Sequence, residues 1–214
     1  MKSVIATNLE RIQSEIGNRA QLIAVTKYQE LEDVKTLYSL GFKTFAENRV
    51  QDLLSKKEVL NNDIEWHLIG TLQTNKVKYI APFIALIESV DSEKLVAEID
   101  KQAAKCQRVI PYLVQLHVAQ EETKHGFSIG EAEAFFNQEI YKKYPNTRCQ
   151  GIMGMATNTD DTTQIETEFR QLKSFFDTHQ KHQLETLSMG MSSDYALAIE
   201  CGSTMIRVGS ALFK

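Results

Sequence analysis

Short apolar segments alternate with amphipathic segments about eight times along the chain, and this alternation limits the fold more than any other feature of the 214 residues. The apolar segments have the length of buried strands, and the amphipathic segments repeat their apolar residues at helical spacing. The predicted strands are residues 22–25, 42–45, 64–69, 83–87, 109–118, 149–155, 184–189 and 204–208. The predicted helices are residues 4–16, 30–40, 48–60, 75–80, 92–106, 130–144, 165–176 and 192–201.

Regular alternation of strands and helices is typical of a parallel sheet whose strands are covered by helices. We therefore expect an α/β fold, a single (β/α)8 TIM-type barrel with an additional N-terminal helix at residues 4–16. A doubly wound open sheet is the alternative, although it rarely needs so many strands in so few residues. The chain has only three prolines and no linker or low-complexity stretch, so we expect one domain covering residues 1–214.

The composition argues against several classes of function. A formal net charge of −4 without a basic block disfavours nucleic acid as the main partner, because phosphate backbones require clustered lysine and arginine. The three cysteines are scattered and lack a C-x-x-C spacing, which predicts neither disulfides nor a zinc site and fits a reduced cytosol. The N-terminus becomes polar too early for a signal peptide, and no apolar run has membrane-spanning length. We therefore expect a cytoplasmic protein.

Lys27 directly follows the first predicted strand and its flanking Thr26. A buried strand normally ends before its first charge, and parallel α/β sheets place their chemistry at the carboxyl edge of the strands. Lys27 is therefore predicted to point across that edge, although a surface lysine at the start of a loop would give the same local pattern.

Two turns rich in small residues follow the last two predicted strands. Gly190 and Ser192 come after the seventh strand, and Gly209 and Ser210 come after the eighth. Unpaired N–H groups at the start of a helix bind phosphate, and the loops after strands seven and eight are the usual phosphate site of such barrels. Arg207 interrupts the apolar eighth strand, so its side chain lies either outward among the helices or inward beside a partner.

A strand-end lysine that faces a phosphate site indicates a Schiff base with a phosphorylated aldehyde. The lysine amine must lose its proton before it attacks a carbonyl, and a partly desolvated site favours the neutral amine. Two classes of ligand meet this description: pyridoxal phosphate, and the sugar phosphates that Schiff-base aldolases use.

Five segments make one of these classes more specific. They are residues 24–27 (AVTK), 45–51 (FAENRVQ), 67–76 (HLIGTLQTNK), 187–192 (LSMGMS) and 202–209 (GSTMIRVG). Together, in this order, they resemble the pyridoxal phosphate homeostasis proteins of the YggS/PROSC type, with departures at Tyr28, Ala46, Asp52 and Ser193. The resemblance implies a single barrel, similar to the N-terminal domain of bacterial alanine racemase, that binds pyridoxal phosphate (PLP) without an established catalytic turnover.

The resemblance also implies where the cofactor would be held. Lys27 would form the Schiff base, and Arg207 would face the pyridine nitrogen. Ser192, with backbone groups of Gly209 and Ser210, would hold the phosphate. No catalytic residue and no metal ligand are implied.

Five further residues lie in the matching segments and would complete the cofactor site. Ser188 and Met189 would lie beside the phosphate, whereas the other three would line the cofactor face. These three are Asn48, His67 and Asn75.

The function expected from this site is intracellular PLP homeostasis, in which the protein holds the cofactor and passes it to apo-enzymes. PLP enzymes gain rate when a protonated pyridine withdraws electrons, but an arginine cannot accept that proton. A weak amino-acid racemase that uses Tyr28 or His67 as a second acid is the alternative, and a sugar-phosphate aldolase is a third hypothesis.

Two other segments carry residues that could belong to a site. His179 and His182 have the spacing of one helix face, but without a third ligand they do not predict a metal centre. Residues 121–127 follow the fifth predicted strand, and we expect them to form a loop over the pocket.

Overall fold

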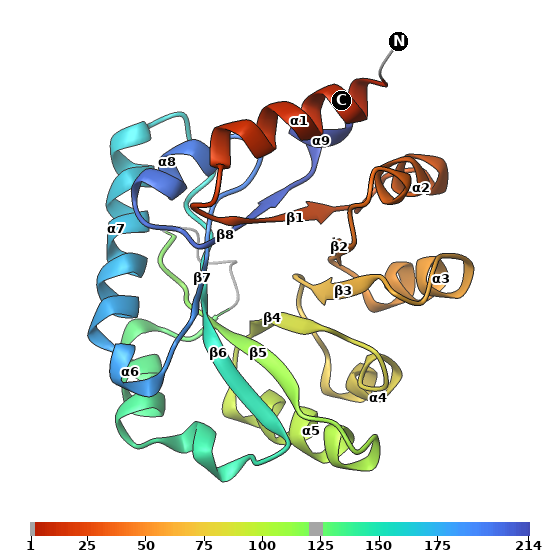
Figure 1. Ribbon diagram of the computed structural model, residues 1–214. Helices are drawn as coiled ribbons and strands as arrows, with labels where there is room; N and C mark the ends of the chain where they lie inside the picture. The colour runs from red at the N-terminus through yellow and green to blue at the C-terminus, as the bar shows by residue number, and fades with distance from the viewer. Residues whose placement is uncertain (1–2, 120–125) are drawn as a thin grey trace.

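The computed structural model describes residues 3–119 and 126–214. In this part of the chain all strands are parallel, and they close into a barrel in sequence order, with β8 paired to β1 (Figure 1). This topology confirms the predicted (β/α)8 barrel and excludes the doubly wound sheet. The strands are β1 (Gln21–Val25), β2 (Thr44–Glu47), β3 (Glu65–Leu68), β4 (Leu86–Val90), β5 (Ile110–Gln115), β6 (Thr147–Met153), β7 (Thr186–Ser188) and β8 (Met205–Val208).

The helices surround the barrel, and the predicted N-terminal helix is present as α1 (Figure 1). The α-helices are α1 (Val4–Ile16), α2 (Leu31–Ser39), α3 (Val50–Val59), α4 (Val77–Ile80), α5 (Glu93–Lys105), α6 (Ile129–Asn137), α7 (Thr162–Thr178), α8 (Tyr195–Glu200) and α9 (Ser210–Phe213). Short 3-10 helices are η1 (Thr74–Lys76), η2 (Ile140–Lys143) and η3 (Gln180–His182).

Apolar side chains fill both sides of the strands. Leu22 and Ala24 of β1 belong to the large core between the barrel and its helices. Ile23 and Val25 of the same strand belong to a second cluster, which also contains Met205 of β8 and fills the barrel interior. Because successive strand residues point to opposite faces, this alternation also decides which way the residues just beyond each strand end point.

Two strands end two or three residues later in the chain than the sequence predicts. β2 runs to Glu47 instead of ending at residue 45, and β4 runs from Leu86 to Val90 instead of over residues 83–87. In both cases the strand continues through a glutamate, Glu47 or Glu88, whose side chain is fully buried. A charge normally marks the end of a buried strand, but each of these carboxylates has buried hydrogen-bonding partners, which are described below.

The predicted helix at residues 130–144 is interrupted. α6 ends at Asn137, and Glu139 takes a left-handed backbone conformation with φ of 52° before η2 begins. The short α9 after β8 was not predicted from the sequence. Of the predicted loop at residues 121–127, residues 121–125 lie outside the described part of the chain.

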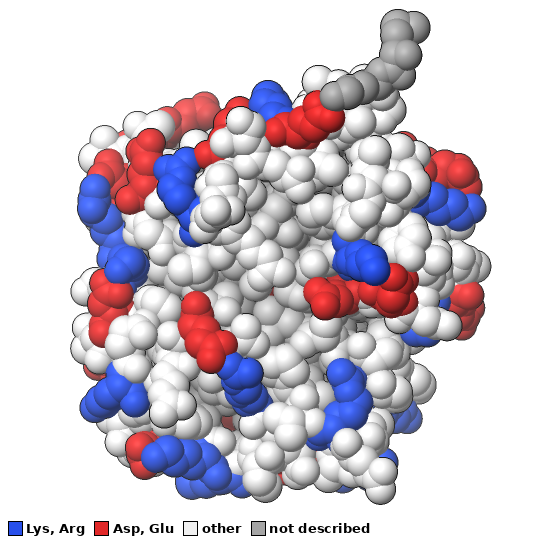
Figure 2. All heavy atoms as spheres, in the orientation of Figure 1, with Lys and Arg blue, Asp and Glu red and all other residues white. Residues whose placement is uncertain are grey.

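Charges of both signs are interspersed around the face seen in Figure 2, and uncharged residues occupy its centre. The described residues of this face therefore form no continuous basic surface. No helix in residues 3–119 or 126–214 is long and apolar enough to cross a membrane. In the same residues, no three His, Cys, Asp or Glu side chains lie close enough together to hold a metal ion.

Candidate functional site

A cavity of about 850 Å³ lies at the carboxyl end of the barrel. Its lining residues lie near the ends of β1 and β8 and in the segments that follow β1, β2, β3, β6, β7 and β8. The carboxyl ends of several strands therefore meet at this cavity. The lining residues are Val25, Lys27, Tyr28, Gln29, Asn48, Ile69, Gly70, Met155, Met191, Ser192, Ser193, Arg207, Gly209, Ser210, Ala211 and Lys214. This is the end at which (β/α)8 barrels place their functional residues.

The inward faces of β1 and β2 continue into Lys27 and Asn48. Val25 and Ala46 belong to the cluster inside the barrel, and Lys27 and Asn48 lie two residues further along the chain. Strand alternation therefore directs both side chains to the cavity, and both are among its lining residues. The prediction that Lys27 points across the carboxyl edge agrees with this arrangement.

A buried polar cluster fixes the backbone directly before Lys27 and Asn48. The Lys56 Nζ atom lies 2.6 Å from the Thr26 carbonyl oxygen and 2.6 Å from Glu47 Oε1. The Thr26 hydroxyl donates a second hydrogen bond to Glu47 Oε1, at 2.6 Å. Thr26 and Glu47 immediately precede Lys27 and Asn48, so this cluster ties together the two chain segments that carry those side chains.

The loops after β7 and β8 meet through Ser192. Its Oγ accepts hydrogen bonds from the backbone N–H of Gly209, at 3.1 Å, and of Ala211, at 3.2 Å. Ser192, Gly209 and Ser210 all line the cavity. A hydroxyl oxygen that accepts two hydrogen bonds still has its own O–H to donate, which suits Ser192 for binding an anionic oxygen in the cavity.

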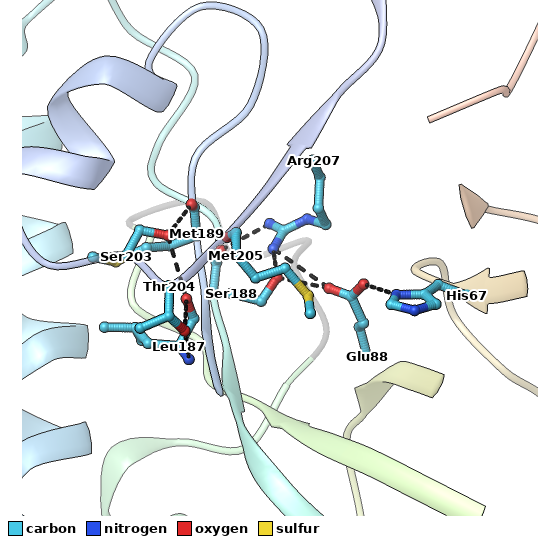
Figure 3. A network of polar contacts seen from close by, with 10 residues as sticks. His67, Glu88, Leu187, Ser188, Met189, Ser203, Thr204, Met205 and Arg207 are labelled. Atoms are coloured by element: carbon cyan, nitrogen blue, oxygen red, sulfur yellow. Dashed lines mark hydrogen bonds and ion pairs between the residues drawn. The ribbon is translucent and has the colours of Figure 1, made fainter. Parts of the chain in front are cut away.

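Arg207 points into the barrel and lies in a buried polar network (Figure 3). Its Nη2 donates to the carbonyl oxygen of Gly154 at 3.0 Å, and its Nη1 donates to the hydroxyl of Ser188. Ser188 in turn donates to Glu88 Oε2 at 2.7 Å, and His67 Nδ1 lies 2.8 Å from Glu88 Oε1. Of the two orientations that the sequence allows, the Arg207 side chain therefore takes the inward one, beside the carboxylate of Glu88.

The charges in this network stabilise one another. Burial opposes ionisation of Glu88, but the hydrogen bond and charge of His67, the charge of Arg207 and the Ser188 hydroxyl outweigh it and lower the pKa of Glu88. Burial also lowers the pKa of Arg207, and the nearby carboxylates of Glu88 and Asp194 oppose that shift. Glu88 is therefore ionised at neutral pH and faces the Arg207 guanidinium, with 3.7 Å between Oε2 and Nη1.

Four of the predicted cofactor residues do not line the cavity. His67 and Ser188 are buried in the network around Glu88. Met189 is buried in the core, and its carbonyl oxygen accepts a hydrogen bond from the Ser203 hydroxyl at 2.8 Å (Figure 3). Asn75 is exposed on η1. Contacts between these four side chains and a cofactor stay predictions.

The residues missed from the sequence are mostly those that support the site. Glu88, Thr26, Glu47 and Lys56 belong to buried polar clusters, although none of the four is among the cavity-lining residues. Glu88 could have been identified, because it is a single charge within an apolar stretch, Ile-Glu-Ser-Val, much as Arg207 is in β8. Lys56 gave no such signal, since an amphipathic helix normally carries lysines.

Gly70 is a position where a side chain would displace the site. A Cβ atom built there would lie 2.2 Å from the carbonyl oxygen of Asn48, which is too close for any real contact. We expect Gly70→Ala to lower the unfolding free energy by about 1–3 kcal/mol, the usual cost of overpacking. Gly130→Ala is the matched control, because a Cβ at Gly130 meets nothing within 4 Å. Urea denaturation of both variants measures the difference, and equal losses would contradict the assigned contact.

The lowered pKa of Glu88 predicts a pH dependence of stability. A carboxyl group whose pKa is lower in the folded state than in the unfolded chain stabilises the fold at pH values above the unfolded-state pKa. For Glu88, this contribution is lost as the pH falls through the folded-state pKa. We expect the unfolding free energy of the wild type to fall more steeply than that of Glu88→Gln between about pH 6 and pH 3. Urea denaturation at several pH values measures both slopes, and parallel slopes would contradict the ionised, hydrogen-bonded state of Glu88.

The sequence of this chain matches a known family and named relatives. The family model of the alanine racemase N-terminal domain matches residues 2–214. A pyridoxal phosphate homeostasis protein of Aquifex aeolicus is 38% identical over 215 residues, covering 96% of this chain and 93% of that protein. A pyridoxal phosphate homeostasis protein of Schizosaccharomyces pombe is 33% identical over 223 residues, covering 99% of this chain and 92% of that protein.

Solved structures agree with these matches. PipY of Synechococcus elongatus PCC7942, solved with PLP bound, is 31% identical and superposes with a TM-score of 0.89, covering 98% of this chain and all of PipY. The alanine racemase of Clostridium difficile 630 superposes with a TM-score of 0.77 at 14% identity, and the match covers 97% of this chain but only 56% of the racemase. The racemase likeness therefore concerns the fold of one part of that enzyme.

Proposed function

This chain belongs to the pyridoxal phosphate homeostasis proteins, and from that premise we propose that residues 1–214 form one domain that holds PLP reversibly through a Schiff base on Lys27. The observation that carries the proposal is one cavity lined by Lys27, by Arg207 and by the hydroxyl and main-chain groups around Ser192. An amine can condense with an aldehyde, an anion-binding turn can hold a phosphate, and a guanidinium can donate to a basic ring nitrogen, so the lining suits a phosphorylated aldehyde with such a ring.

The residues present fit the cofactor. Asn48 lines the cavity, and its side-chain Oδ1 is buried without a hydrogen-bond partner among the described residues. The volume of about 850 Å³ lies within the range of small-molecule sites. Gly209 lines the cavity and packs closely against the end of β1, since a Cβ there would lie 3.3 Å from the carbonyl oxygen of Val25.

Each residue has a distinct task in this proposal. Ser192, with main-chain groups of Gly209 and Ser210, holds the phosphate, and Arg207 donates toward the ring nitrogen. When bound, PLP supplies an aldehyde that condenses with a primary amine, forming a C=N bond and releasing water. Lys27 provides that amine, and because hydrolysis reverses the condensation, the cofactor can be released intact.

Holding and passing on PLP explains this arrangement better than turnover. Arg207 stays charged and only donates hydrogen bonds, so it cannot accept a proton from the ring nitrogen. That nitrogen therefore stays unprotonated, and the ring withdraws electrons only weakly. A sugar phosphate would have no ring nitrogen for Arg207 to contact. The protein therefore serves as a reservoir that protects PLP and delivers it to apo-enzymes.

Transfer to an apo-enzyme tests the carrier role. The loaded protein is mixed with a PLP-dependent enzyme stripped of its cofactor, and the recovered activity is followed over time. We expect reactivation by the loaded wild type, with matching loss of the visible absorbance band from the donor. An apo-enzyme that regains no activity from the loaded protein, but does so from free PLP, would overturn the carrier role.

A weak racemase is the second candidate, because Tyr28 lines the cavity directly after Lys27 and is 81% exposed. His67, the other acid considered, is buried beside Glu88 and does not line the cavity. Racemisation would exchange the α-proton of an amino acid with solvent. Deuterium incorporation at the α-carbon above a Lys27→Ala control would support this candidate, and incorporation equal to that control would remove it.

A further inference from the structure

Glu88 is joined to the proposed cofactor site through a single side chain. It lies on β4, its side chain is fully buried, and it is not among the residues that line the cavity. Its carboxylate nevertheless contacts Ser188 of β7 and lies 3.7 Å from Arg207 of β8 (Figure 3). Arg207 does line the cavity, so the contacts of Glu88 reach a ligand there through that guanidinium, and its charge acts on the ligand across the same short distance.

The guanidinium of Arg207 is fixed from three strands at once. Gly154, directly after β6, accepts from Nη2, and Ser188 accepts from Nη1. The Ser188 hydroxyl donates its hydrogen bond to Glu88, so the Ser188 oxygen is left as an acceptor for Arg207. An arginine has more N–H donors than these two bonds use, so the fixed guanidinium still has donors for a ligand.

Charge balance requires a carboxylate at this place. Arg207 is only 3% exposed, and a buried cation without a nearby anion is strongly disfavoured. The groups that face this pair are His67 from β3, whose Nδ1 bonds Glu88, and Asp194 from the loop after β7, which acts on Arg207. Among the described residues, Glu88 is the carboxylate within ion-pair distance of Arg207, at 3.7 Å.

We propose that Glu88 is a positioning residue that, through Ser188 and its own charge, orients and neutralises Arg207 so that the guanidinium faces the PLP ring nitrogen. The proposal rests on the proposed function, and it gives His67 and Ser188 a role in supporting Arg207 rather than in touching the cofactor. It predicts that Glu88 changes both the affinity for PLP and the electrostatic potential at the bound cofactor.

Glu88→Gln tests this, because glutamine keeps the size of the side chain and removes its charge. We expect the dissociation constant for PLP to rise about tenfold, as for other residues that orient a ligand-binding group. The site also becomes more positive, which disfavours the protonated Schiff-base nitrogen, so the pH midpoint of the visible absorbance band shifts to lower pH. A purely structural role would not move that midpoint.

Glu168→Gln is the matched control. Glu168 is also buried, but the hydrogen bonds that it accepts come from the N–H and hydroxyl of Thr157 and from the side-chain amide of Gln164. An affinity and a midpoint in Glu88→Gln equal to those in Glu168→Gln would overturn the proposal. A wild type that fails to bind PLP would instead overturn the proposed function, so the two failures are distinguishable.

Ser188→Ala keeps the proposal testable if Glu88→Gln does not fold. It removes only the hydroxyl that joins Arg207 to Glu88. We expect a severalfold weaker affinity for PLP, because the guanidinium loses one of its anchors. Rescue in Glu88→Asp, which restores the charge, would support the electrostatic part, and wild-type affinity in Ser188→Ala would contradict the anchoring part.

Discussion

Lys27→Ala is expected to lose the visible absorbance band that the wild type gains on addition of PLP, and to release PLP during gel filtration. The alanine has no amine to condense with the aldehyde, so only the contacts to the phosphate and the ring remain. We expect the dissociation rate of PLP to rise by about a hundredfold or more. Absorbance and phosphate content of the eluted protein measure the loss.

Lys35→Ala is the control for this change. Lys35 is exposed on α2 and pairs with the exposed Glu32, so its removal leaves the cavity unchanged. The control variant should retain PLP like the wild type. A Lys27→Ala protein that keeps the same absorbance band as Lys35→Ala would show that another amine holds the cofactor.

Lys56→Met is expected to destabilise the fold by about 3–5 kcal/mol, the range observed when one partner of a buried ion pair is removed. Lys56 is 14% exposed and bonds Glu47, which is fully buried. Among the described residues, the Thr26 hydroxyl is then the one donor left to the Glu47 carboxylate, whose Oε2 has no partner even in the wild type. Urea denaturation measures the loss of unfolding free energy.

Two comparisons isolate the cause of that loss. Lys35→Met removes an exposed lysine from an exposed ion pair and should cost less than about 1 kcal/mol. The double variant Glu47→Met/Lys56→Met replaces both charges and should be more stable than Lys56→Met alone, because no uncompensated charge stays buried. A double variant less stable than the single one would contradict this account of the Glu47 and Lys56 pair.

The fold could be predicted because the barrel repeats one pattern, and an error at one strand end does not change the number of units. Lys27 and Ser192 could be predicted as site residues for a similar reason, since both follow predicted strands at the edge where such barrels bind ligands. The ends of β2 and β4 were misplaced because Glu47 and Glu88 are charges in buried strand positions.

The surroundings of Arg207 could not be predicted from spacing. Its partner Glu88 lies more than a hundred residues earlier in the chain, and the two meet only when the barrel closes through Ser188. The resemblance named His67 and Ser188 as cofactor-site residues, but it could not separate residues that line a cavity from residues behind them. That distinction depends on which strand face each side chain occupies.

Borohydride reduction of the PLP-loaded wild type, followed by peptide mass mapping, tests the central claim most directly. Reduction converts the Schiff base to a stable amine and so marks the lysine that holds the cofactor. The account predicts a pyridoxyl mass on the peptide that contains Lys27 and loss of the visible band. A pyridoxyl group on another lysine, such as Lys214, which also lines the cavity, or no modification at all, would contradict it.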